Sequence, residues 1–88
     1  MEKKMKDKIF IELIVPDIEE IYNIYIPINK RIGNIIKLLN KAIYELTDGV
    51  FIGTNKIGLY NRETGVKYDI NKLVRETDIR NGTVLVLL

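Results

Sequence analysis

Alternating apolar residues near the N-terminus predict two consecutive β-strands. Every second residue from Ile9 to Val15 is apolar, and the same period of two returns from Tyr22 to Ile28. This period is typical of strands that bury one face against a core. Because the connection between them is short, the two strands are expected to form an antiparallel hairpin. Pro27 has no N–H group to donate, so the second strand is expected at an edge of the sheet.

The apolar period then changes from two residues to about 3.6, which predicts an amphipathic helix. Its apolar stripe consists of Ile32, Ile35, Ile36, Leu39, Ile43 and Leu46. Asn29 is a candidate N-cap, and Gly33 falls within the first turn. Glycine readily adopts the left-handed conformation that closes a helix, so the helix is expected to end near Gly49.

Shorter elements are predicted between this helix and Leu88. The loop after the helix contains three glycines and the apolar triplet Val50-Phe51-Ile52. Strands are expected over residues 57–61 and 66–69, followed by a single helical turn around Leu73. Asn81-Gly82 predicts a tight turn into a last strand over residues 83–88. One helix covering one face of a mixed four- to five-stranded sheet buries both apolar sets, which predicts a single α+β domain over residues 9–88.

The sequence contains no Ser, Cys, His, Gln or Trp among its 88 residues. Nucleophilic catalysis normally uses Ser or Cys beside His, and zinc sites use Cys and His. We therefore predict a protein that is not an enzyme, with no catalytic residue, no cofactor and no metal site. Asp17, Glu19 and Glu20 could in principle bind a cation, but without further ligands at a recognisable spacing a solvated turn is the preferred interpretation.

The net charge of +2 is confined to residues 1–8, because residues 9–88 carry equal numbers of basic and acidic side chains. We interpret residues 1–8 as a flexible basic arm, with a tether to an anionic surface as the alternative. The balanced domain argues against nucleic-acid binding by Lys30, Lys37 and Lys41. No apolar run is long enough for direct membrane insertion and no signal peptide precedes the first strand, which favours a cytoplasmic protein.

Two segments carry a resemblance to known proteins: the helix Arg31-Ile-Gly-Asn-Ile-Ile-Lys-Leu-Leu39, and the stretch from Leu73 to Ile79 followed by Arg-Asn-Gly-Thr-Val-Leu-Val-Leu. With the order of elements, they make residues 9–88 resemble the ubiquitin-like β-grasp fold. In that fold the first hairpin and the last strand form the centre of the sheet, and the helix crosses it diagonally.

The glycines at 49, 53 and 58 lack the Gly-Lys-Ser/Thr ending of a phosphate loop, so they are interpreted as loop residues.

The segments Leu59-Tyr-Asn-Arg62 and Asp78 to Leu87 are also similar to the bacterial YukD-like family. Members of that family are small ubiquitin-like proteins that accompany type VII secretion systems and lack a conjugation tail. The resemblance implies a protein–protein interaction module whose partner is a secretion-system component. It leaves two alternatives open: a sulfur carrier or protein modifier, if the natural chain continues beyond Leu88 to a Gly-Gly tail, and a ubiquitin-like domain of a larger secretion component.

A protein-binding surface is expected on the face of the sheet opposite the helix. If Ile9, Ile11, Leu13 and Val15 face the helix, then Phe10 and Ile14 must emerge on the other side, because successive strand side chains alternate. The resemblance places Val84, Val86 and Leu88 inward, which would leave Leu85 and Leu87 beside them, with Tyr60 as a fifth member. Such a patch would reach several hundred Å², a size at which exposed apolar surface indicates an interface.

Two other uses of this face stay open. It could be the contact of a homodimer, or it could be covered by the arm or by the Val50-Phe51-Ile52 loop.

Overall fold

The computed structural model describes residues 7–50 and 58–88. The first six residues of the expected arm, together with Phe51 and Ile52 of the apolar triplet, lie outside the described residues. Lys8, which the sequence placed in the arm, is the first residue of strand β1. The carbonyl of Asp7 accepts a hydrogen bond from the Ile28 amide (2.9 Å), so the pairing of the first hairpin extends to the last two residues of the expected arm.

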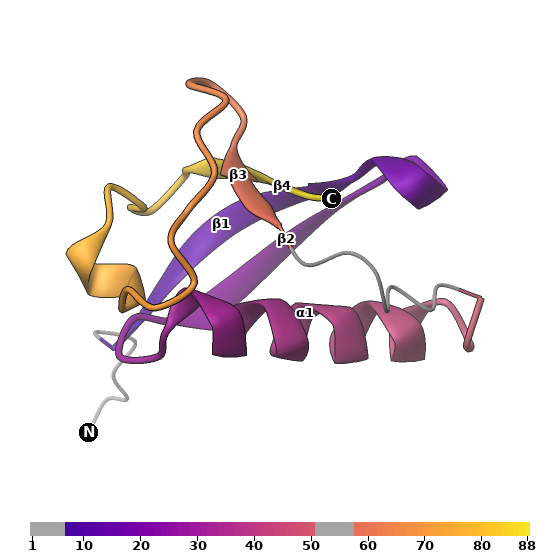
Figure 1. Cartoon of the computed structure of the whole chain (residues 1–88). Helices are drawn as coiled ribbons and strands as arrows, with labels where there is room; N and C mark the ends of the chain where they lie inside the picture. Colours follow the sequence, from indigo (N-terminus) through magenta and orange to yellow (C-terminus); the bar gives the residue numbers. More distant parts are fainter. Residues whose placement is uncertain (1–6, 51–57) are drawn as a thin grey trace.

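Four strands form one mixed sheet in the order β2-β1-β4-β3 (Figure 1). They span Lys8–Val15 (β1), Glu20–Pro27 (β2), Leu59–Asn61 (β3) and Val84–Leu87 (β4). β1 runs antiparallel to β2 and parallel to β4, while β3 runs antiparallel to β4. The expected hairpin and the edge position of β2, which contains Pro27, are confirmed.

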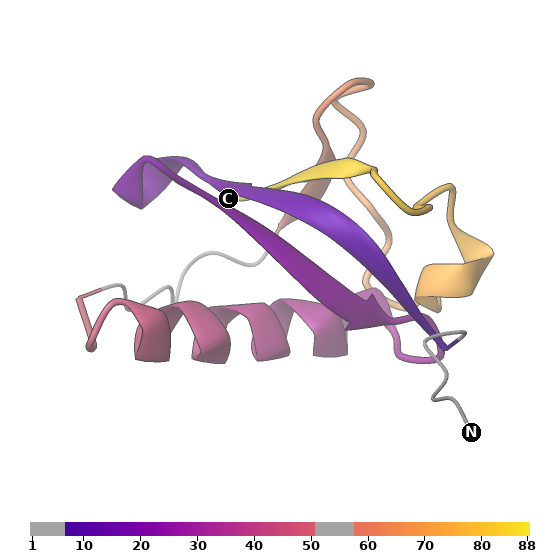
Figure 2. The same cartoon turned by 180° about the vertical axis from the view of Figure 1, so that it is seen from behind.

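The core lies between the sheet and the helix α1 (Ile32–Leu46), which covers one face of the sheet (Figures 1 and 2). The sheet contributes the alternate residues of β1, and the helix contributes five of the six residues of the predicted stripe. The sixth, Leu46 in the last turn, is 63% exposed and lies outside the core. The buried members are Ile11, Leu13, Val15, Ile26, Leu59, Leu85 and Leu87 from the strands and Ile32, Ile35, Ile36, Leu39 and Ile43 from α1. The predicted α+β fold, a mixed sheet covered on one face by one helix, is confirmed.

The N-terminus of α1 is capped by backbone carbonyls that come from a distant part of the chain. The amide of Ile32 donates to the carbonyl of Lys72 (2.8 Å), and the amide of Gly33 donates to that of Ile70 (2.9 Å). A Cβ atom at position 33 would lie 3.3 Å from the Ile70 oxygen, which explains a glycine in this first turn.

Asn29 is therefore not the N-cap that we expected. The N-cap is Arg31, which makes no side-chain capping bond, and the Asn29 side chain instead accepts a hydrogen bond from Arg75 (2.6 Å). Since the segment at 70–72 already satisfies the first free amides of the helix, a side-chain cap is not required there.

The chain between β3 and β4 wraps around one end of the sheet with little regular structure. The strand expected at 66–69 is reduced to a single bridge between Lys67 and Tyr60, and the expected helical turn is a 3-10 helix over Val74–Glu76. The turn at Asn81-Gly82 is where the sequence placed it, and Gly82 has a φ of 89°. The Asn81 side chain accepts a hydrogen bond from the Phe10 amide (2.8 Å), which ties this turn to β1.

Candidate protein-binding surface

The face of the sheet opposite α1, called here the outer face, carries an apolar row that crosses all four strands. Ile14 of β1 pairs with Ile21 of β2 on one side and with Val86 of β4 on the other. Val86 pairs in turn with Tyr60 of β3. Because directly paired residues point to the same side of a sheet, these four side chains stand next to one another. This outer row is Ile21, Ile14, Val86 and Tyr60.

The placement of Leu85 and Leu87 on this face was wrong. Leu85 is 0% exposed and Leu87 is 1% exposed, and both belong to the core beneath the sheet. Leu85 pairs with the core residue Leu13, and Leu87 pairs with the core residue Leu59. The residues of β4 that point outward are Val84 and Val86, and a shift of one position is enough to exchange the faces, since the side-chain period of a strand is two.

Phe10 and Ile14 lie on the outer face as predicted, and so does Tyr60. Phe10 belongs to a second apolar contact near the other end of β1, where its ring meets the ring of Tyr25 edge-on with centroids 5.2 Å apart. Aromatic pairs in this geometry are stabilising beyond the area that they bury. The outer face therefore has two apolar centres, the outer row and the Phe10–Tyr25 pair.

The side chains between these two centres are more polar. Glu12 of β1 pairs with Asn23 of β2 and with Val84 of β4, so this row separates the aromatic pair from the outer row. Opposite charges mark the two ends of the outer row. Glu19 lies two residues before Ile21 in the chain, whereas Lys67 forms a bridge with Tyr60. Glu20 pairs with the core residue Val15 and so points to the other face. A partner on this face would therefore meet apolar side chains with an acidic and a basic end.

Ile21 and Tyr25 are members of the outer face that sequence reasoning missed. They are 58% and 54% exposed, more than any other large apolar side chain described on this face. The signal for them was present, because the alternation of Tyr22, Ile24 and Ile26 toward the helix leaves residues 21, 23 and 25 on the other side. Large exposed apolar side chains gathered on one face are typical of a surface that binds another protein.

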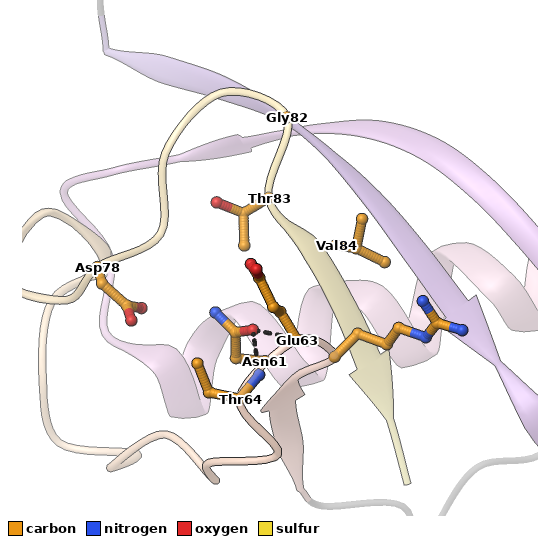
Figure 3. A pocket seen from close by; sticks show the side chains of 8 residues that line it. Asn61, Glu63, Thr64, Asp78, Gly82, Thr83 and Val84 are labelled. Atoms are coloured by element: carbon orange, nitrogen blue, oxygen red, sulfur yellow. Dashed lines mark hydrogen bonds between the residues drawn. The ribbon is translucent and has the colours of Figure 1, made fainter.

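A polar hollow of about 460 Å³ lies beside the outer face, between the turn after β3 and the segment that leads into β4 (Figure 3). Four of the polar side chains that line it, Asn61, Thr64, Asp78 and Thr83, make hydrogen bonds within the fold. The side-chain oxygen of Asn61 accepts hydrogen bonds from the amides of Glu63 (2.8 Å) and Thr64 (3.1 Å). The hydroxyl of Thr83 accepts one from the Arg80 amide (2.8 Å). These bonds shape the two loops, which gives the hollow a structural explanation.

Tyr68 joins the two sides of this hollow. Its hydroxyl donates to the carboxylate of Asp78 (2.6 Å) and accepts a hydrogen bond from the side-chain nitrogen of Asn61 (3.0 Å). Burial of the phenol, reinforced by the hydrogen bond to Asp78, raises the pKa of Tyr68 from 10.0 to about 12. The protonated hydroxyl is thus a fixed link between β3 and the segment before β4.

This link predicts a stability difference that depends on pH. Because the pKa of Tyr68 is higher in the folded state than in the unfolded one, folding stability should fall as pH rises from 10 to about 12. Tyr68→Phe has no hydroxyl to titrate, so its stability lacks this dependence on pH. The substitution also leaves the buried Asn61 amide without its acceptor, which should lower the free energy of unfolding by about 1 kcal/mol at pH 7. Urea denaturation should show that the difference in unfolding free energy between wild type and Tyr68→Phe is smaller at pH 11 than at pH 7. An equal gap at both values would contradict the assigned link.

The carboxylates Asp17, Glu19 and Glu20 do not gather into a metal site in the described part of the chain. Over residues 7–50 and 58–88, no group of three or more His, Cys, Asp or Glu side chains could hold a metal ion. Glu19 adopts a left-handed conformation (φ 55°) at the end of the short 3-10 helix between β1 and β2. None of the helices described is long and apolar enough to cross a membrane.

Comparison with known proteins identifies the fold but no sequence family. No protein-family model matches the chain, and no curated protein sequence does. Among solved structures, the ubiquitin-like domain of an Arabidopsis thaliana protein has a TM-score of 0.64 at 13% identity, over 92% of this chain and 76% of that one.

Two further structures come from secretion machinery. The EccD5 ubiquitin-like domain from Mycobacterium xenopi gives a TM-score of 0.58 at 14% identity, over 92% of this chain and 94% of that one. A chain of the ESX-5 inner membrane complex gives 0.66 at 15% identity, over 93% of this chain but only 21% of that longer chain. The ubiquitin-like β-grasp fold implied by the sequence is confirmed, with type VII secretion components among its structural neighbours.

Proposed function

We propose that this chain is a non-enzymatic ubiquitin-like module that binds a protein partner through the outer face of its sheet. The observation that carries the proposal is the outer row of Ile21, Ile14, Val86 and Tyr60, which crosses all four strands. Covering exposed apolar area is worth about 25 cal/mol per Å², so a contiguous row is a favourable place for a partner to dock. The mechanism is docking, and it requires no reactive group.

The charges at the two ends of this row should set the orientation of the bound partner. Glu19 precedes β2 two residues before Ile21, and Lys67 forms a bridge with Tyr60. Complementary charges across an interface accelerate encounter and fix orientation more than they add affinity. We therefore expect the partner to present an apolar patch with a basic end and an acidic end.

We further propose that the partner is a component of a bacterial type VII secretion system, with this chain acting as an accessory or regulatory subunit. This proposal is supported by the similarity of residues 59–62 and 78–87 to the YukD-like family. The likeness to the EccD5 domain and to a chain of the ESX-5 complex supports it independently, at the level of the fold.

Secretion by the native host tests this function. The chromosomal copy is deleted and replaced by the wild-type protein, by Val86→Asp or by Lys41→Asp, a control on the exposed side of α1. We expect the deletion and Val86→Asp to lose export of the small helical substrates of the system, and Lys41→Asp to retain it. Normal export in the deletion strain would overturn the secretion role.

A further inference from the structure

Among the described residues, 7–50 and 58–88, no strand or loop is bonded to the outer edge of strand β2, whose backbone groups point away from the sheet. The carbonyl of Phe10 accepts a hydrogen bond from the Gly82 amide (2.8 Å), and the amide of Glu12 donates one to the Thr83 carbonyl (3.1 Å). The backbone N–H and C=O groups of the even-numbered residues of β1 therefore point toward β4. Backbone groups alternate sides along a strand, so Ile11 and Leu13 face β2, where they pair with Ile24 and Tyr22. The odd-numbered residues of β2 must then direct their N–H and C=O groups outward.

The outward-facing residues are Ile21, Asn23 and Tyr25. β2 is the terminal strand of the sheet, next to β1 alone (Figure 2). Within residues 7–50 and 58–88, no hydrogen bond joins their outer side to another segment. Such an edge is a template for pairing with a further strand.

This edge also lacks the features that normally keep strands apart. Proteins protect exposed edges with charged side chains, proline or bulges. From Ile21 to Ile26 the strand reads Ile-Tyr-Asn-Ile-Tyr-Ile, with no charge and no proline. Glu20 and Pro27 stand only at its two ends, and every residue of β2 pairs with β1 without a bulge. A segment of this kind is expected to be covered in the working protein.

The order of side chains in β2 is complementary to itself. If two copies of the strand run antiparallel about a two-fold axis at Asn23, Ile21 of each copy stands opposite Tyr25 of the other. Tyr22 likewise stands opposite Ile24, so each of these neighbouring cross-strand pairs joins an aromatic to a β-branched residue. Such pairs are among the favourable ones in antiparallel sheets.

The backbone fits the same axis. Residues 21, 23 and 25 are the ones whose amides and carbonyls point outward, and the axis at Asn23 pairs 21 with 25 and 23 with itself. In an antiparallel ladder, directly opposed residues whose groups face each other exchange both of their hydrogen bonds. Every outward amide of Ile21, Asn23 and Tyr25 would then find an acceptor on the other copy.

We propose that this chain self-associates through antiparallel pairing of β2 with β2 of a second copy, centred on Asn23, to form one continuous sheet. The proposal goes beyond the proposed function, because it uses the edge of the sheet and leaves Ile14, Val86 and Tyr60 open to a partner. The contact is confined to one strand, so the dimer is weak and depends on concentration.

Charge substitution at the axis tests this geometry with folded proteins. The Asn23 side chain is exposed on the outer face, so Asn23→Lys and Asn23→Asp should both fold. Like charges opposite one another at the axis should weaken self-association of each variant roughly fivefold. An equimolar mixture of the two should restore it by pairing opposite charges, as measured by sedimentation velocity. Lys41→Asp, which lies on α1, should associate like wild type.

Amide exchange gives a second readout that depends on register. As protein concentration rises, the amides of Ile21, Asn23 and Tyr25 should gain protection, while those of Tyr22 and Ile24 are protected at every concentration. Asn23→Pro removes an outward amide without breaking a bond to β1, and should weaken association about 30-fold by deleting one hydrogen bond from each copy.

Three results would overturn self-pairing. The first is a monomer at every concentration up to about 1 mM, where even a contact worth about 4 kcal/mol is detectable. The second is association that the Asn23 variants leave unchanged. The third is protection of these amides only when a co-purified protein is added, which would assign the edge to a strand from that protein. These three results concern only the edge of β2. If they exclude self-pairing, partner docking on the outer face remains to be tested separately.

Discussion

Replacement of Leu85 by Asp should unfold the protein, whereas replacement of the next residue, Val86, should not. Leu85 is fully buried beside Leu13, and an unpaired carboxylate there costs several kcal/mol. Small domains have a total stability of about 5–15 kcal/mol, so this single change removes most or all of it. Val86 is only partly buried on the outer face, so Val86→Asp should lose about 1 kcal/mol of stability through strand propensity.

The alanine variants at the same two positions should also differ in how much unfolding free energy they lose. Leu85→Ala should cost about 2–5 kcal/mol of unfolding free energy, because it leaves a cavity in the core. Val86→Ala should cost less than about 1 kcal/mol. Urea denaturation followed by circular dichroism measures both. If Val86→Ala proved the more damaging change, the assigned faces of β4 would be reversed.

Loss of partner binding is the second large effect that we expect. Ile14 and Val86 lie at the centre of the outer row, and central apolar residues of an interface dominate its affinity. Ile14→Asp or Val86→Asp should weaken binding by at least about 2 kcal/mol, which is roughly 30-fold. Calorimetry with the partner isolated from the native host measures the affinity.

Two controls keep this result interpretable. Each variant must show the wild-type circular dichroism spectrum, so that lost binding is not lost folding. Lys41→Asp makes a change of similar polarity on the exposed side of α1 and should bind like wild type. Unchanged affinity in a folded Val86→Asp protein would exclude the outer row as the docking surface.

The strands and helix with a clear apolar period were predictable from the sequence. β1 alternates apolar residues at Ile9, Ile11, Leu13 and Val15 with a more polar second face, so the side toward the helix followed directly. The stripe of α1 followed in the same way from Ile32 to Ile43, since neighbouring residues of the helix differ in polarity. The edge position of β2 followed from Pro27, which has no N–H group to donate to a neighbouring strand.

The faces of β4 could not be predicted, because its sequence has no period. Val84, Leu85, Val86 and Leu87 are all apolar, so either phase fits a buried strand. The phase is fixed only by parallel pairing with β1, which places Leu85 opposite Leu13 across a long separation in the chain. The cap of α1 is non-local for the same reason, since the carbonyls of Ile70 and Lys72 replace the expected Asn29 side chain.

The candidate surface was therefore predicted in its position and only partly in its members. Phe10, Ile14 and Tyr60 lie where the sequence placed them, while Val84 and Val86 take the places given to Leu85 and Leu87. Ile21 and Tyr25 were within reach of sequence reasoning, because the alternation along β2 already turned them away from the helix. The outer row is continuous across all four strands, which strengthens its interpretation as a docking face.

Site-specific photo-crosslinking in the native host shows directly which face of the protein contacts a partner. A photoreactive amino acid is placed at Val86 on the outer face or at Lys41 on the exposed side of α1, and the crosslinked proteins are identified by mass spectrometry. We expect position 86 to capture one component of the type VII secretion system, and position 41 to capture none. Capture of the same component from position 41 alone would contradict docking through the outer face.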